Sequence, residues 1–283
     1  MNTAPLIQSL IENPSEHSRN SSFYKTHEQE LLNILENSDL NNGKSGHESF
    51  EPFGDLHFPY REMGAINTIH LFGLDELIIF SYYWANKSRY KNVADLGANI
   101  GLHSLIMDKC GFSINSFEPD PIHVGVFQEN IANNKSVNIT INQKAISDKS
   151  DTLDFIRVLG NTTGSHLAGA KEDPYGELET FSVETSDINE VLLNNDFVKM
   201  DIEGQEATAI LSTKKDTWAN VEMILEVGTE KNAKIIFPST HVIYEGINEV
   251  KKDIGEEEEA KPVLSYSSSK ATNERQLRES GKN

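Results

Sequence analysis

Apolar and polar positions alternate along this chain in blocks that predict helices and strands in turn. Leu74 to Asn86 has the length and apolar content of a buried helix. A short apolar strand follows at Asn92 to Ala94, and the apolar residues of Leu102 to Cys110 share one helical face. Strands separated by helices predict an α/β fold with a doubly wound, mostly parallel sheet. Further core strands are expected at Ser113 to Phe117, Val137 to Ile141, Phe197 to Met200 and Val221 to Leu225, with a possible sixth at His241 to Tyr244.

Two segments between these strands have clear local signals of their own. Asp120 followed by Pro121 is a typical helix start, and Asn133-Asn134 is a plausible end. Thr152 to Val158 and Leu178 to Val183 alternate like the two arms of a β-hairpin around a long glycine-containing loop. We therefore expect a hairpin inserted into the parallel sheet.

The two ends of the chain differ in composition from this central part. Residues 1–73 are predicted to form a polar N-terminal extension with a helix at Thr26 to Asn37 and a strand-like segment at Ile66 to Phe72. Residues 74–250 carry the α/β domain. Residues 251–283 are acidic and then Ser-rich, and are expected to form a disordered tail.

The most informative motif is Asp95-Leu-Gly-Ala-Asn-Ile-Gly101, which lies between a predicted strand and a predicted helix. Glycines allow a ligand to approach the backbone, and unpaired amides at a helix start attract negative charge. Glu118 follows Gly97 by twenty-one residues, at the end of the next strand, where nucleotide-binding folds hold a ribose diol. The two features together predict an adenosine-type cofactor.

The glycine spacing decides which cofactor is favoured. Dinucleotide sites use G-x-G-x-x-G, whereas this turn is D-x-G-x-x-x-G with Asn99 in place of the second glycine. A pyrophosphate is therefore not expected, and an NAD-dependent oxidoreductase is disfavoured. S-adenosylmethionine has no phosphate, and its carboxylate and ammonium suit an acid, an Asn and a few amides. A nicotinamide or flavin, or a turn of purely structural value, are the alternatives.

Several acids follow strands whose carboxyl ends should meet at one crevice. These are Asp201, Glu203 and Glu226, besides Asp95 and Glu118. Charged groups at such positions must be solvated or used, although Asp201 also suits a helix N-cap. Asp201 and Glu203 are candidate general bases, and His166 in the glycine-containing loop is a third. No metal site is predicted, although three such carboxylates could also bind Mg²⁺.

Four motifs in order carry a family resemblance. They are the Val93 to Leu105 segment, Phe117-Glu-Pro-Asp-Pro121, Lys199-Met-Asp-Ile-Glu-Gly-Gln-Glu206 and Ile224-Leu-Glu-Val227. Together they resemble the FkbM-family methyltransferases. The resemblance implies a class I Rossmann-like fold and S-adenosylmethionine-dependent methylation, usually of a hydroxyl on a sugar or natural product. It further implies that the methionine end of the cofactor is held by Asp95, Gly97, Asn99 and Gly101. By the same resemblance, Glu118 binds the ribose, Ala145 lies at the edge of the adenine, and Asp201 lies beside the transferred methyl group.

Composition narrows the range of partners. The 283 residues carry a formal net charge of −19 and include one cysteine, Cys110. An acidic surface repels phosphate polymers, so nucleic acids and anionic membranes are not expected partners. The N-terminus has no export signal, and no apolar stretch is long enough to span a bilayer, so a cytoplasmic location is expected. Cys110 is expected to be a buried core thiol.

The sequence as a whole therefore predicts an O-methyltransferase acting on a small molecule or glycan. The alternative from a different class is a non-catalytic nucleotide-binding or interaction protein on the same fold. The oligomeric state is left open.

Overall fold

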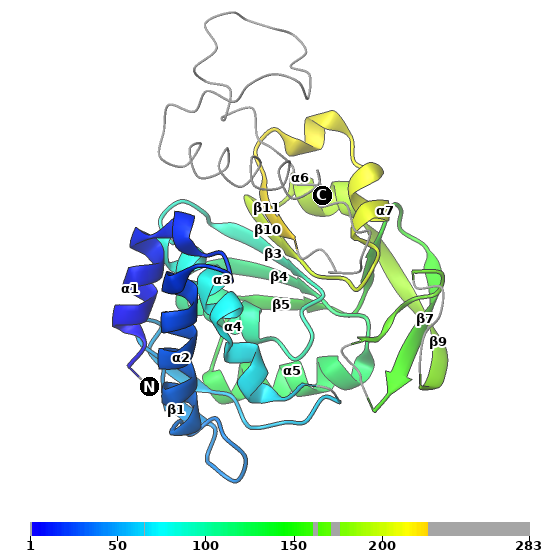
Figure 1. Cartoon of the computed structure of the whole chain (residues 1–283). Helices are drawn as coiled ribbons and strands as arrows, with labels where there is room; N and C mark the ends of the chain where they lie inside the picture. Colours follow the sequence, from blue (N-terminus) through cyan, green and yellow to red (C-terminus); the bar gives the residue numbers. More distant parts are fainter. Residues whose placement is uncertain (1, 65, 161–163, 171–175, 226–283) are drawn as a thin grey trace, which may run out of the picture.

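The central sheet is most deeply buried at its middle strands, β3 (Asn92–Leu96) and β10 (Phe197–Met200), and less so toward its edges. The computed structural model describes residues 2–64, 66–160, 164–170 and 176–225. All strand pairs of this sheet are parallel, in the order β11-β10-β3-β4-β5 (Figure 1). A parallel sheet of this kind needs cover on both sides. Its strands are β3 (Asn92–Leu96), β4 (Ser113–Phe117), β5 (Ile139–Asn142), β10 (Phe197–Met200) and β11 (Glu222–Leu225).

Separate hydrophobic clusters cover the two faces of this sheet. Successive strand residues point to opposite faces, so Val93 and Ala94 belong to different clusters. Val93 packs with α3 (Leu74–Ala85) and α4 (Leu102–Lys109), and α5 (Pro121–Asn134) adds Val126 at the edge of this cluster. Ala94 packs with α6 (Ile188–Leu193). The predicted α/β fold with a parallel sheet and helices is confirmed.

A second sheet is inserted in the chain between β5 and β10 of the parallel one, and its strands β7 and β9 lie at the right of Figure 1. Strand β7 (Thr152–Leu159) pairs antiparallel with β9 (Glu177–Asp187) over eight residues. The far end of β9 pairs in parallel with β6 (Ala145–Ser147), and β8 (His166–Leu167) pairs with β7. The sheet order is β6-β9-β7-β8. Short strands β6 and β8 were not predicted, because two or three residues give no measurable alternation.

The N-terminal residues contain two α-helices where the sequence predicts one. The predicted helix at 26–37 begins earlier, as α2 (Ser22–Glu36), because the Ser21 side chain accepts a hydrogen bond from the Tyr24 amide. The additional helix is α1 (Ala4–Glu12). Both helices contribute buried side chains to the cluster that contains α3 and α4. A small antiparallel pair, β1 (His47–Ser49) and β2 (Asp55–His57), leads back toward α3.

The predicted strand-like segment at Ile66 to Phe72 is wrong. The chain instead forms a 3₁₀ helix, η2 (Thr68–Phe72). Asn67 caps this helix: its side chain accepts from the Ile69 amide at 3.0 Å, and its own amide donates to Nδ1 of His70. A local cap thus overrides the β-branched pattern. The remaining short elements are η1 (Pro14–Glu16), α7 (Glu206–Leu211) and η4 (Lys215–Trp218).

Some predicted features lie outside the described residues. These are Glu226, the possible strand at His241 to Tyr244 and the tail at 251–283. Within the described part of the chain, no helix combines the length and the apolar character that crossing a bilayer requires.

Candidate functional site

The glycine turn after β3 is pressed against the loop that follows β10. Gly97 has a φ of +76°, and a Cβ atom at this position would lie 1.7 Å from the carbonyl oxygen of Asp201. The two loops meet because β3 and β10 are neighbours in register, with Leu96 opposite Met200. Only glycine permits this approach. The contact brings Asp201 to the edge of the predicted cofactor turn.

The expectation that unpaired amides of this turn face a ligand is wrong for four of them. The amides of Gly97 and Ala98 both donate to the carbonyl of Phe117 at 3.0 Å. The Asn99 amide donates to Oε2 of Glu118 at 2.8 Å, and the Gly101 amide to the carbonyl of Ala98. The protein itself satisfies these donors, which agrees with a cofactor that brings no phosphate to the turn.

Two residues of the predicted motif lie behind the turn. Gly101 has a φ of +90°, and a Cβ there would lie 2.0 Å from the Phe127 ring, so this glycine allows α5 to pack closely. Asp95 is fully buried and accepts a 2.6 Å hydrogen bond from the Ser104 hydroxyl. Neither lines a cavity. Their positions are structural ones that support the turn.

A cavity with a volume of about 290 Å³ lies against the turn. It is lined by predicted site residues from four different loops and strands. His166 is not among them: its side chain is 1% exposed on β8, with Nδ1 2.9 Å from the carbonyl oxygen of Gly164. The predicted residues that do line the cavity are Gly97, Asn99, Glu118, Ala145, Asp201 and Glu203.

One wall of this cavity is apolar. Phe117 ends β4, Ala145 and Ile146 come from β6, and Phe155 and Leu167 come from β7 and β8. The two sheets therefore meet at the cavity. A slot with apolar side chains on one wall and carboxylates at the ends suits a flat heteroaromatic ring joined to a polar group.

Glu118 is held in place by three partners at the rim of the cavity. Its Oε2 accepts from the Asn99 amide, its Oε1 accepts from the Asp120 amide at 2.9 Å, and Nδ1 of His123 lies 3.4 Å from Oε1. Burial by itself lowers the pKa of His123, but the hydrogen bond and charge of Glu118, together with Asp120, raise it above its usual value.

Two buried polar atoms of cavity-lining residues have no hydrogen-bond partner among the described residues. They are Oδ1 of Asn99 and Nε2 of His123. Asn99 adopts φ +50°, a left-handed conformation that Asn tolerates better than most residues. An unpaired buried polar group costs free energy, so both atoms are suited to hydrogen-bond a ligand.

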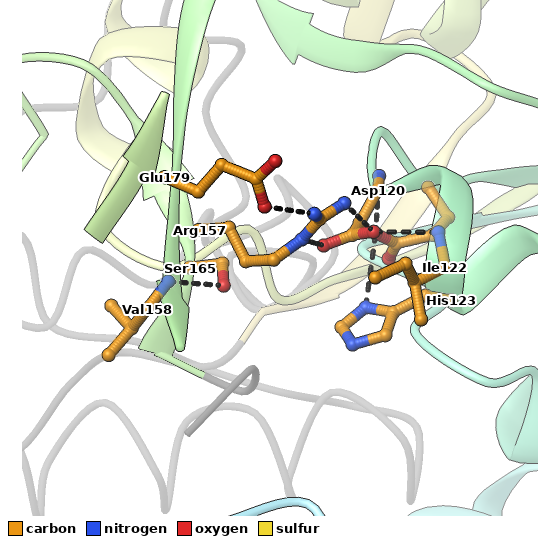
Figure 2. A network of polar contacts seen from close by, with 8 residues as sticks. Asp120, Ile122, His123, Arg157, Val158, Ser165 and Glu179 are labelled. Carbon is orange, nitrogen blue, oxygen red and sulfur yellow. Dashed lines mark hydrogen bonds and ion pairs between the residues drawn. The ribbon is translucent and has the colours of Figure 1, made fainter. Parts of the chain in front are cut away.

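A buried ion pair ties the second sheet to the start of α5 and was missed in the sequence. Arg157 on β7 donates from Nε and Nη2 to the two carboxylate oxygens of Asp120, both at 2.7 Å, and from Nη1 to Glu179 at 2.6 Å. Figure 2 shows the guanidinium between the two acids, with His123 beyond Asp120. Burial would raise the pKa of Asp120, but its hydrogen bond to Arg157 and the charge of His123 lower it. One arginine in an alternating strand gives no sequence signal for such a pair.

A smaller cavity of about 60 Å³ adjoins the first one. The two share Leu71, Glu76, Gly97, Asn99 and Asp201 in their linings. The smaller cavity is also lined by His103 and Lys199.

Charged groups of both signs meet at this smaller cavity. The Lys199 ammonium lies 3.7 Å from Oδ1 of Asp95 and 3.6 Å from Oδ2 of Asp201. Glu76 accepts from Nε2 of His103 at 2.9 Å. Burial would raise the pKa of Glu76, but the hydrogen bond and charge of His103 and the charge of Lys199 lower it. Glu76 therefore remains ionised at neutral pH.

Glu76 is a site residue that sequence reasoning missed. It lies in the first turn of α3, where an acid usually complements the helix dipole and needs no other explanation. Glu206, in the first turn of α7, also has a structural role. It accepts hydrogen bonds from the amides of Ile202 and Gly204 and so closes the loop that carries Asp201 and Glu203. In the described part of the chain, no group of three or more His, Cys, Asp or Glu residues is arranged to hold a metal ion.

Comparison with known protein families places this site in context. The family model described as the methyltransferase FkbM domain matches residues 95–256, more than half of the chain. The chain belongs to the FkbM methyltransferase family. Among solved structures, it is similar to one from Pyrococcus horikoshii, described in its title as a candidate RNA methyltransferase, at 16% identity. That match covers 66% of this chain and 68% of the other, with a TM-score of 0.28. A comparison with curated proteins finds no match.

The family match begins at Asp95 and therefore includes the glycine turn, Glu118, the β7–β9 pair and the Asp201 loop. It does not include α3, so Glu76 lies outside the matched segment. The lining of both cavities thus includes Glu76, which precedes the segment matched by the FkbM domain.

Proposed function

We propose that this FkbM-family protein is an S-adenosylmethionine-dependent methyltransferase that methylates a hydroxyl group on a sugar, glycan or small natural product. The observation that carries the proposal is the main cavity. It has an apolar slot at β6, a fixed carboxylate at Glu118, and the Asp201 loop against Gly97. The sheet order β5-β4-β3-β10-β11, with a cofactor turn after β3, also suits a class I methyltransferase.

The lining residues fit this cofactor without help from a metal. Ala145, Ile146 and Phe155 offer apolar contact for the adenine, and Glu118 and Nε2 of His123 offer hydrogen-bond partners to the ribose hydroxyls. The unpaired Oδ1 of Asn99 can accept from the ammonium of the methionine end. When bound, the cofactor supplies a methyl group on a sulfonium, from which a neutral thioether is a good leaving group.

On the acceptor side, the chain's own residues position the hydroxyl and take its proton. Asp201 and Glu203 both line the main cavity, where their carboxylates can accept hydrogen bonds from the acceptor molecule and orient it. Acids outnumber cations at this cavity, so a neutral acceptor is favoured over a phosphate or carboxylate. The remaining rate acceleration comes from holding the hydroxyl in line with the methyl group and from excluding water.

The test is a calorimetric titration with S-adenosylmethionine, S-adenosylhomocysteine and NAD. Replacing Glu118 with Ala removes a charged hydrogen-bond partner, which contributes about 1.5–3 kcal/mol, so we expect the affinity for both adenosyl ligands to fall at least tenfold. Glu190→Gln changes an exposed acid on α6 and should bind like the wild type. Thermal unfolding of each unliganded variant shows whether it is folded. Wild-type protein that binds neither adenosyl ligand would instead support the non-catalytic interaction protein.

A further inference from the structure

The smaller cavity differs from the main one in its chemistry. The main cavity has an apolar wall, whereas the smaller one is lined by Glu76, His103, Lys199 and Asp201 besides the glycine turn. Its volume of about 60 Å³ is that of about two water molecules in the liquid. It is therefore too small for a cofactor and large enough for one hydroxyl-bearing carbon of a larger molecule.

Glu76 lies at the junction of the two cavities. It lines both, and its side chain keeps 30% of its surface exposed although the helix that carries it is part of the core. Of its two carboxylate oxygens, Oε2 accepts from His103, and no hydrogen bond is found for Oε1 within the described residues. One oxygen is thus fixed by the protein, and the other is available to a ligand.

A buried chain of hydrogen bonds fixes the orientation of this carboxylate. The Tyr83 hydroxyl lies 2.9 Å from Nδ1 of His103, and Nε2 of His103 lies 2.9 Å from Glu76. Burial, with the charges of Asp95 and Glu76, raises the pKa of Tyr83 well above its usual value, so the phenol keeps its proton and donates to Nδ1. Nε2 then carries the imidazole proton and donates to Glu76. Tyr83 thus orients His103, and His103 orients Glu76. Such a chain of three groups is the arrangement expected of a proton acceptor.

From this geometry we infer that the smaller cavity receives the acceptor hydroxyl, and that Glu76 is the general base, oriented by His103. The inference rests on the proposed methyltransferase function and names its acceptor site. The hydroxyl proton goes to Oε1 of Glu76. The acceptor oxygen forms a bond to the methyl carbon as the carbon–sulfur bond breaks, and the electron pair of that bond stays on sulfur.

Charge defines the class of acceptor. Glu76 and Asp201 are the acids that line this cavity, and the Lys199 ammonium lies within 4 Å of both Asp201 and the buried Asp95 behind the turn. A phosphate or carboxylate would meet net repulsion here, while a neutral hydroxyl can donate to Glu76 and accept from Lys199. The site is therefore one for a neutral, hydroxyl-rich molecule, with Lys199 and Glu76 as its donor and acceptor.

The test uses the full chain and the variants Glu76→Gln, His103→Gln and Glu190→Gln. In Glu76→Gln the new amide keeps the shape of the side chain and can still accept from His103, but it cannot take a proton. Methyl transfer from labelled S-adenosylmethionine is measured with glycerol, myo-inositol and methyl glucopyranoside as neutral acceptors, and with glucuronate and glucosamine as charged ones. We expect transfer to a neutral acceptor to fall by about 10²–10⁴ in Glu76→Gln, with affinity for S-adenosylmethionine within about twofold of wild type. His103→Gln should lose less, and Glu190→Gln nothing.

When none of these acceptors is methylated, a binding measurement tests whether the smaller cavity receives a neutral hydroxyl. Nitrogen-15 resonances of His103 are followed as each acceptor is added, with and without S-adenosylhomocysteine. A neutral acceptor that shifts them in wild type but not in Glu76→Gln supports the site. Absence of any shift, a preference for a charged acceptor, or full transfer by Glu76→Gln would overturn it. Failure of wild type to bind S-adenosylmethionine contradicts the proposed function instead, and the titration without cofactor still tests the cavity.

Discussion

At the scale of single residues, the described glycines of the motif serve backbone contacts and not only a ligand. Gly97 admits the carbonyl of Asp201, and Gly101 admits the ring of Phe127. Asn99 is a left-handed residue whose side-chain oxygen has no hydrogen-bond partner within the described residues. The turn thus serves close packing, and it sets the positions of Asn99, Glu118 and Asp201 at the cavity.

We expect Gly97→Ala to unfold or severely destabilise the protein, because a methyl group would overlap the Asp201 carbonyl and the backbone there has a positive φ. The free energy of unfolding, measured in urea, should fall by at least about 3 kcal/mol. Gly125→Ala is the matched control. Gly125 lies exposed in α5 with open space around it, so alanine should stabilise the helix by about 1 kcal/mol or less. Equal stability of the two variants would contradict the contact at Gly97.

At the scale of elements, the cavity depends on how the two sheets are joined. The end of β9 pairs with β6, and Arg157 on β7 grips Asp120 at the start of α5. Asp120 also caps α5 by accepting from the Ile122 amide. The Asp120 carboxylate therefore links the helix start to the β7–β9 pair, while the Asp120 amide donates to Glu118. One residue thus fixes the apolar wall relative to the glycine turn.

Replacing Arg157 with Leu should cost about 3–5 kcal/mol of stability, because the Asp120 carboxylate is left buried without its partner. Adding Asp120→Asn should restore part of the loss. Asn removes the charge and can still cap α5. Chemical denaturation of the single and double variants measures both effects. A double variant no more stable than Arg157→Leu would contradict the role of the ion pair, whereas Lys149→Leu, at an exposed ion pair, should leave stability unchanged within error.

At the scale of the whole molecule, the N-terminal helices share a core with the helices beside the sheet. Leu6, Ile7 and Leu10 of α1 are almost completely buried in the cluster that contains Leu77 and Phe80 of α3. Since α3 supplies Glu76 to both cavities, the packing of α1 and α2 supports the placement of the site. In Figure 1 these helices lie at the left and the β7–β9 pair at the right, with the parallel sheet between them.

We expect Leu10→Ala to lower the free energy of unfolding by about 2–5 kcal/mol, the usual cost of a large-to-small change at a fully buried site. Leu32 on α2 is 47% exposed, so Leu32→Ala should change stability by less than about 0.5 kcal/mol. A single unfolding transition seen by both fluorescence and circular dichroism would show that the N-terminal helices unfold together with the sheet. An early separate transition in wild type would contradict the shared core.

The sequence by itself determined the α/β fold, the five strands of the parallel sheet and the place of the glycine turn after one of them. Local patterns decide these features: short strands alternate with amphipathic helices, and Asp120-Pro121 starts a helix. The FkbM family was also readable from four motifs, because their order along the chain is itself a sequence property. The strand-like interpretation of Ile66 to Phe72 failed since the Asn67 cap competes with an apolar pattern too short to decide.

Only the tertiary structure decided which polar residues meet at the site. His166 was a candidate by its loop position but is buried on β8 and is not among the residues that line the cavity, while Glu76 reaches both cavities from a helix with no motif. The Arg157–Asp120 pair joins residues 37 positions apart. Such contacts depend on the orientation of one element against another, and no pattern local to either element encodes that orientation.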